Sequence, residues 1–242
     1  MTDRIRRVFV PATPRPVDRV DLDPDESHHV ARVLRLKLGD RVAVFDGRGG
    51  EWDATIDEVT KERVSVVVGA ERAGEVEPRL TVVLHQAIVR PEKLEWVLQK
   101  GTEVGVASFR LVATERVEAA PPSPARLARY GRILMEACKQ SGRRVLPSLT
   151  VGPLDAPPGG VCAIALAQGP GSAPLATVLA GPPAPEVWLA VGPEGGFTPE
   201  ELDSLAGRGW ILASLGPRVL RTETAGCIAA AIVLHSWADL GA

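Results

Sequence analysis

The hydrophobic pattern of the chain changes near residue 78, and this change constrains the fold more than any other feature. Beyond it, short apolar runs typical of buried strands alternate with stretches of helical periodicity. The predicted strands are 80–84, 109–113, 161–167 and 186–191, and the predicted helices are 91–104 and 125–141. Such alternation is typical of a mostly parallel sheet that helices cover on both faces. We therefore expect an α/β domain over residues 73–242.

The first seventy residues follow a strand pattern instead. Apolar and polar residues alternate at 7–10, 41–45, 51–56 and 63–68, and a glycine-rich turn, DGRGG, joins the second and third of these segments. This pattern predicts a hairpin in a small antiparallel sheet or barrel. Val30, Val33 and Leu34 lie at helical spacing and predict a short helix beside it. The polar segment 70–78 ends in proline, so we expect a separate β domain over residues 1–72.

The composition is that of a globular protein with a sizeable core: 242 residues, of which 45% are hydrophobic and 24% charged. The N-terminus alternates arginine with proline, and no run of eighteen apolar residues occurs, so we expect a cytoplasmic protein with no membrane partner. We expect no metal site, because no cluster of ligand residues has metal spacing. The three cysteines, Cys138, Cys162 and Cys227, are expected to be structural thiols, and His85 and His235 to be satisfied structural histidines.

The charge pattern points to a polyanionic partner. The net charge of -2 argues against coating of nucleic acid by overall charge, but an average hides local patches. Residues 126–144 carry six bases against Glu136, and residues 28–44 carry four against Asp40. Either patch alone is equally well interpreted as a solvated face. Both patches together, with Arg4, Arg6 and Arg7, favour a polyanion.

Three glycine-containing loops follow predicted strands, at 165–172, 191–197 and 215–225. Ligands of parallel sheets bind beyond the carboxyl ends of strands. The middle loop precedes a predicted capping box that starts a helix at Thr198, so its six residues exceed what a connection needs. The middle loop lacks the Lys-Ser/Thr ending of a phosphate-binding loop. The segment 169–174, which begins in the first of the three loops, lacks the last glycine of a dinucleotide-binding loop. The last loop holds charged residues just before the very apolar helix 225–237, which favours a functional site there.

The motifs VGPEGGF at 191–197 and LGPRVLRTETA at 215–225 closely resemble those of the RsmE-type 16S ribosomal RNA (uracil-N3) methyltransferases of the SPOUT superfamily. The resemblance spans the chain, and Gly101 and Val104 are small departures from it outside these loops. It extends to RRVFV at 6–10, HHVARVLR at 28–35, QKGTEVG at 99–105 and EACKQSGR at 136–143. It implies a PUA-like β-barrel at 1–72, a SPOUT-type α/β domain with a C-terminal trefoil knot at 73–242, and a homodimer built partly from the final helix.

The resemblance also implies a cofactor, S-adenosylmethionine, bound by the glycine-rich loops. Backbone groups of such loops can read the edge of adenine without charged side chains, and leucines can pack against its ring. The implied cofactor-binding residues are Leu166, Val191, Gly192, Pro193, Glu194, Gly195, Leu215, Gly216, Arg218, Leu220, Arg221, Thr222 and Ala225.

Methylation of uracil N3 requires removal of its proton and alignment of the nitrogen with the sulfonium methyl group. Arg221 is a candidate to stabilise the uracil anion, and Glu223 or Glu194 to accept the proton. Two structural interpretations are equally open. The two glutamates could cap helices, or Arg221 could form an ion pair with Glu223, and in both cases Thr222 is expected to cap the final helix.

The implied partner is 16S ribosomal RNA within the small ribosomal subunit. Two other functions stay open: a related SPOUT enzyme that acts on a transfer RNA base or on ribose, and an RNA-binding protein without catalysis. The predicted RNA-binding residues are Arg6, Arg7, His28, Arg32, Arg35, Arg132, Lys139 and Arg143.

Overall fold

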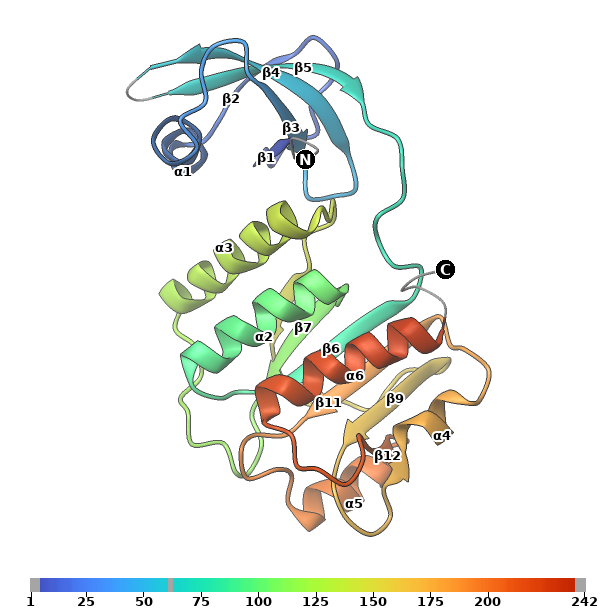
Figure 1. Cartoon of the computed structure of the whole chain (residues 1–242). Helices are drawn as coiled ribbons and strands as arrows, with labels where there is room; N and C mark the ends of the chain where they lie inside the picture. Colours follow the sequence, from blue (N-terminus) through green and yellow to red (C-terminus); the bar gives the residue numbers. More distant parts are fainter. Residues whose placement is uncertain (1–4, 61–62, 238–242) are drawn as a thin grey trace. The chain divides into compact units, whose positions relative to one another are not determined.

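The computed structural model describes residues 5–60 and 63–237, so Arg4 of the predicted basic surface lies outside the described residues. The chain forms two compact units (Figure 1). The first consists of Met1–Glu77 with Cys138–Leu146, and the second of Pro78–Ala137 with Pro147–Ala242. The sequence-based boundary after residue 72 stays a prediction.

The first unit contains a five-stranded sheet in the order β1-β3-β4-β5-β2. Its strands are β1 Arg6–Phe9, β2 Arg19–Asp21, β3 Arg41–Phe45, β4 Glu51–Val59 and β5 Val64–Glu71. The hairpin predicted between β3 and β4 is confirmed, and Gly47 and Gly49 adopt the positive φ values of 73° and 115° that its turn requires. The antiparallel expectation is wrong for β1, which runs parallel to β3 and makes the sheet mixed.

A short helix accompanies this sheet, as predicted. It begins as α1 Pro24–His28, where the Asp23 side chain accepts from the amide of Glu26, and continues as the π-helical turn η1 His29–Val33. Val30 is fully buried in the core of the unit, but Val33 is exposed, contrary to the predicted apolar face. The π turn changes the spacing from 3.6 residues, so the expected face does not form.

Buried ion pairs hold the segment 138–146 within the first unit. The Arg7 guanidinium lies 2.6 Å from Glu51 and donates to the carbonyl oxygens of Cys138 and Arg143. The Lys139 ammonium pairs with the buried carboxylate of Glu26. A further pair, 2.8 Å long, joins Arg143 and Glu77. Because charges removed from water need such partners, these side chains are part of the internal structure of the unit.

The second unit contains a seven-stranded sheet in the order β10-β12-β9-β11-β6-β7-β8. All neighbouring strands are parallel, which confirms the predicted fold class. The strands are β6 Thr81–Ala87, β7 Ser108–Val112, β8 Ser148–Val151, β9 Val161–Leu166, β10 Ala173–Pro174, β11 Glu186–Val191 and β12 Ile211–Ser214. The central strand β11 is apolar because neighbours flank it on both sides and helices cover its faces.

Helices α2 Pro91–Val104 and α6 Thr222–Ser236 pack side by side on one face of this sheet (Figure 1). Helix α5 Pro199–Gly207 covers part of the opposite face through Leu205, near Trp210 and Phe197. Its capping box between Thr198 and Glu201 is present, as predicted. The remaining helices are α3 Pro124–Ser141, which was predicted, and α4 Leu175–Leu179, which was not.

The three thiols and His85 are buried or partly buried. Cys138 and Cys227 are buried, Cys162 is partly buried, and all three are unpaired, which confirms the predicted structural thiols. His85 is fully buried against Trp188 and Trp210, with ring centroids 4.7 and 5.4 Å away. Neither ring nitrogen has a hydrogen-bond partner, so the expectation of a satisfied histidine is wrong.

Within the described ranges, no helix has the length and apolarity needed to cross a membrane.

Candidate functional site

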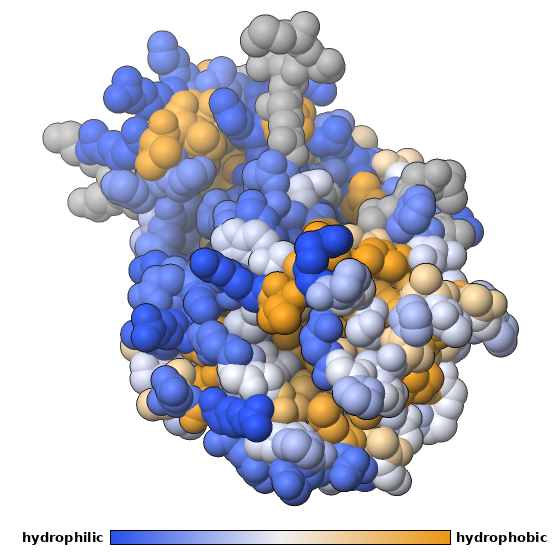
Figure 2. All heavy atoms as spheres, turned by 60° about the horizontal axis from the view of Figure 1, so that its bottom comes forward, coloured by the Kyte–Doolittle hydropathy of each residue, from blue (hydrophilic) through white to orange (hydrophobic). Residues whose placement is uncertain are grey.

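The carboxyl ends of β9, β11 and β12 meet at a cavity of about 590 Å³, which we call the loop cavity. Eleven of the implied cofactor-binding residues line it: Leu166, Val191, Gly192, Pro193, Glu194, Gly195, Leu215, Leu220, Arg221, Thr222 and Ala225. Gly216 and Arg218 do not line it; instead, their carbonyl oxygens accept hydrogen bonds of 3.1 and 3.2 Å from the Gln168 side chain. Figure 2 brings the lower side of Figure 1 forward and shows hydrophobic surface among hydrophilic groups.

The glycine-rich loop 192–197 is held in one conformation by close packing and hydrogen bonds. A Cβ atom at Gly192 would lie 3.0 Å from the backbone of Gly196 and Phe197, so the loop folds back against itself at this residue. The Thr222 hydroxyl donates to the Gly192 carbonyl oxygen at 2.6 Å and accepts from the buried Gln86 amide at 2.9 Å. These contacts join the middle loop to the last one and define the floor of the loop cavity.

Arg116, from the loop after β7, also supports this site. Its guanidinium donates to the carbonyl oxygens of Gly195 at 2.7 Å and Phe197 at 3.3 Å. The neighbouring amide of Glu115 donates to the capping-box carboxylate of Glu201 at 2.9 Å. A fourth strand end therefore braces the glycine-rich loop.

The predicted catalytic carboxylates lie around a lysine that sequence reasoning missed. The ammonium of Lys93, in the first turn of α2, lies 2.8 Å from Glu194 and 3.7 Å from Glu223. The hydrogen bond from Lys93 lowers the pKa of Glu194, which makes that carboxylate a weak proton acceptor. The Glu223 side chain is 14% exposed and the Lys93 side chain 28%.

Arg221 lies at the rim of the site, with 82% of its side chain exposed and its guanidinium 4.0 Å from Glu223. It is the N-cap residue of α6, and the prediction of Thr222 as the cap is wrong, because Thr222 is already the first helical residue. The missed residues Lys93 and Arg116 follow β6 and β7, so the strand-end rule applied to every strand points to the segments that contain them.

A second cavity of about 780 Å³, which we call the side cavity, adjoins the loop cavity. The two share Lys93, Arg116, Glu194 and Gly195 in their linings. The rest of the side cavity is lined by Ile88, Val89, Arg90, Glu115, Val117, Glu118 and Ala119. Its walls thus combine apolar surface with charged groups.

The predicted RNA-binding residues divide into two groups. Arg6, His28, Arg32, Arg35 and Arg132 are exposed. Arg7, Lys139 and Arg143 are held in the buried ion pairs described above, so we do not retain them in the proposed RNA surface. The physical reason is that leaving these pairs would strand the buried carboxylates of Glu51 and Glu26, and Arg143 is itself buried.

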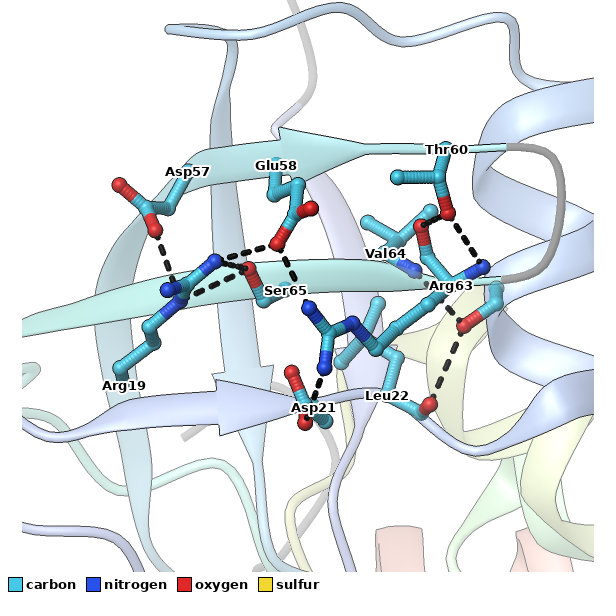
Figure 3. A network of polar contacts seen from close by, with 10 residues as sticks. Arg19, Asp21, Leu22, Asp57, Glu58, Thr60, Arg63, Val64 and Ser65 are labelled. Carbon is cyan, nitrogen blue, oxygen red and sulfur yellow. Dashed lines mark hydrogen bonds and ion pairs between the residues drawn. The ribbon is translucent and has the colours of Figure 1, made fainter.

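Two other arginines of the first unit are paired on its sheet (Figure 3). Arg19 lies 2.9 Å from Asp57 and contacts Glu58 and Ser65 as well. Arg63 bridges Glu58 at 2.9 Å and Asp21 at 3.4 Å. Because acidic partners compensate their charge, this face is a weaker polyanion surface than the helix with His28, Arg32 and Arg35.

Comparison with known proteins agrees with this architecture. Residues 76–234 match an RNA methyltransferase domain, and residues 22–69 match an RNA methyltransferase PUA domain. In the part of the chain that the structure describes, no group of three or more His, Cys, Asp or Glu side chains is arranged to hold a metal ion.

Individual relatives match nearly the whole chain. The ribosomal RNA small subunit methyltransferase E of Synechocystis sp. is 33% identical over 219 residues, which are 88% of this chain and 71% of the relative. That of Bacillus subtilis is 28% identical over 242 residues, covering 91% and 93%. The structure of the Neisseria gonorrhoeae enzyme of the same name, bound to S-adenosyl methionine, has a TM-score of 0.90 at 29% identity and covers 98% of this chain and 100% of that one. By its two domain matches, its relatives and its fold, the chain belongs to the family of the ribosomal RNA small subunit methyltransferases E.

Proposed function

We propose that this protein transfers a methyl group from S-adenosylmethionine to N3 of a uridine in 16S ribosomal RNA of the small subunit. The observation that carries the proposal is the loop cavity, in which two glycine-rich loops at parallel strand ends meet beside charged side chains. Backbone groups at such strand ends are free to bind a ligand. The family membership supports the same reaction.

The loop cavity suits the cofactor in size and chemistry. Its volume of about 590 Å³ lies within the usual range for small-molecule sites. Leu166, Leu215 and Leu220 offer apolar surface for an adenine ring, and the backbone of 191–195 offers donors and acceptors for its edge. When bound, S-adenosylmethionine supplies an electrophilic methyl group.

The protein's part in the reaction is positioning and electrostatics. N3 of uracil must lose its proton and lie in line with the methyl group. Glu194, Glu223 and Arg221 are the proposed reacting side chains, of which the two carboxylates lie beside Lys93. Because the pKa of Glu194 is lowered, a proton that this carboxylate accepts would pass on to solvent instead of remaining on the residue.

The proposed partners use two further surfaces. Exposed bases of the first unit, with Arg132 of α3, bind RNA phosphates and position the substrate. A homodimer forms through the outer surface of α6 and α2, where Trp96, Ile228 and Ile232 are exposed. The trefoil knot of the second domain, the domain boundary after residue 72 and the cytoplasmic location are proposed with them.

Transfer of labelled methyl groups in vitro tests this function against its alternatives. The full-length protein is incubated with labelled S-adenosylmethionine and, separately, with small subunits that lack the modification, naked 16S RNA and transfer RNA. We expect label in the uracil base of 16S RNA. Label in transfer RNA or in ribose would favour a related enzyme, and RNA binding without cofactor binding would favour a non-catalytic protein.

A further inference from the structure

We infer that the side cavity receives the target nucleotide and that Lys93 is the cation that contacts its base. The inference rests on the proposed function and assigns a place and a residue to its substrate. The two cavities share four lining residues, so a base in the side cavity would lie next to a methyl group in the loop cavity. Methyl transfer requires this adjacency, because the reacting atoms must be about 3–3.5 Å apart.

The lining of the side cavity suits a base extruded from an RNA strand. Enzymes that modify bases hold them in a pocket between apolar side chains and hydrogen-bonding groups. Ile88 and Val89 are buried, and together with Val117 and Ala119 they form apolar walls for a pyrimidine ring. The exposed guanidinium of Arg90 at the same cavity provides a charge for the attached phosphate.

Lys93 is the cation best placed to act on the base. Among the described residues, Arg90, Lys93 and Arg116 are the cations that line the side cavity, and only Lys93 and Arg116 also line the loop cavity. One nitrogen of the Arg116 guanidinium, Nη1, donates to the carbonyl oxygens of Gly195 and Phe197, which holds this side chain against the loop 192–197. The Lys93 ammonium uses one of its protons for Glu194, which leaves others for a carbonyl oxygen of uracil.

The chemistry of the step requires such a cation. The N3 proton passes to a nearby carboxylate, directly or through water, and from there to solvent. The nitrogen electron pair forms a bond to the methyl carbon, and the carbon–sulfur pair stays with sulfur as S-adenosylhomocysteine is formed. Before transfer, the negative charge of deprotonated uracil is shared by N3 and the two adjacent carbonyl oxygens. A neighbouring ammonium stabilises this anion and lowers the pH at which N3 loses its proton.

The pH dependence of this step reflects every charged group around the shared border. The start of α2 contributes Arg90 and Lys93, and the loop after β7 contributes Glu115, Arg116 and Glu118. The loop 192–197 contributes Glu194, and the start of α6 contributes Arg221 and Glu223. Removal of Lys93 takes the paired cation from Glu194 and leaves Glu223 with Arg221 alone, 4.0 Å away, which further disfavours the anion.

The test is single-turnover methylation of small-subunit RNA by Lys93→Met and Lys93→Arg at saturating cofactor and RNA, measured across pH. We expect Lys93→Met to react roughly 100-fold more slowly. The pH at which the rate of Lys93→Met rises should be about one unit higher than for wild type. Lys93→Arg should restore part of the rate. The matched control is Lys100→Met, which removes an ammonium from the same helix where it pairs with Glu103 outside both cavity linings, and should react like wild type.

A wild-type rate and pH profile for Lys93→Met would overturn the inference, while active wild-type protein in the same assay would leave the proposed function intact.

Ala119→Phe provides a second test that does not depend on the folding of the lysine variants. It places a ring in the side cavity and should abolish RNA methylation while calorimetry shows unchanged affinity for S-adenosylmethionine. Undiminished methylation by this variant would place the target base elsewhere.

Discussion

The Thr222 hydroxyl donates a 2.6 Å hydrogen bond to the carbonyl oxygen of Gly192 and thereby joins the two glycine-rich loops of the loop cavity. The same hydroxyl accepts from the side-chain amide of Gln86, which is fully buried on β6. One side chain thus links two loops and a strand of the central sheet. The geometry of the cavity floor depends on it.

Thr222→Val should therefore destabilise the protein and weaken cofactor binding. Valine has nearly the same shape but leaves the buried Gln86 amide and the Gly192 carbonyl without this partner, at a cost of about 1–3 kcal/mol. Urea unfolding and calorimetric titration with S-adenosylmethionine measure the two effects. Thr222→Ser, which keeps the hydroxyl, is the control. Equal stability and affinity for the valine and serine variants would show that the bond does not matter.

Gly192→Ala should lower the affinity for S-adenosylmethionine by about tenfold or more, since displaced backbone donors and acceptors no longer meet the ligand. The added Cβ would lie 3.0 Å from backbone atoms of Gly196 and Phe197, and backbone cannot move aside as a flexible side chain can. Gly207→Ala in α5 meets no atom within 4 Å and serves as the control. Calorimetry is the measurement, and unchanged affinity for the Gly192 variant would contradict the assigned floor of the cavity.

Arg6 and Arg7 are neighbours on β1 and should respond differently to substitution. Alternation along a strand directs successive side chains to opposite faces. Arg7 is buried against Glu51, so Arg7→Met should cost about 3–5 kcal/mol of unfolding free energy. Arg6 is exposed, so Arg6→Met should leave stability unchanged and weaken RNA binding in a salt-dependent way. Urea denaturation measures the stability of both variants, and titration with RNA at several salt concentrations measures binding. A loss of stability in Arg6→Met, or none in Arg7→Met, would contradict this assignment.

His85 should make stability depend on pH. Burial, and secondarily the nearby charge of Arg110, lowers its pKa from 6.5 to about 4. The unfolded chain therefore binds a proton more readily than the folded one. This contribution to stability is complete above pH 6.5, falls as the pH drops towards 4, and amounts to about 3 kcal/mol over that window.

His85→Phe removes the titrating group and keeps an aromatic ring beside Trp188 and Trp210. The difference in unfolding free energy between this variant and wild type, measured from pH 7.5 to 4, should grow in favour of phenylalanine as the pH falls. A difference that stays constant over this range would mean that His85 does not titrate as described.

Much of the fold was predictable because the hydrophobic pattern is local. The hairpin β3–β4, the helices α2, α3 and α5, and the central strands β9 and β11 all have clear periodicity or capping signals in their own residues. The parallel pairing of β1 was not predictable, since it is decided by long-range contacts. The short elements β10 and α4 carry too few residues for a pattern to emerge.

The candidate site shows the same division. The two glycine-rich loops were evident from their motifs, whereas Lys93 and Arg116 reach the site from other strand ends and lie far from those motifs in sequence. Burial also separates bases that look alike in sequence: Arg7 and Lys139 are internal, and Arg32 is not. Gly101, a departure from the family pattern, is explained by the Phe109 ring, which would lie 2.8 Å from an added Cβ.

The central claim, that this protein methylates N3 of a uridine in 16S ribosomal RNA, is tested most directly by nucleoside mass spectrometry of that RNA from a strain that lacks the gene. The account predicts that 3-methyluridine is absent from 16S RNA of the deletion strain, returns with the wild-type gene, and stays absent or strongly reduced with the Gly192→Ala and Lys93→Met variants. Undiminished 3-methyluridine in the deletion strain, or loss of a methylated nucleoside from transfer RNA instead, would contradict it.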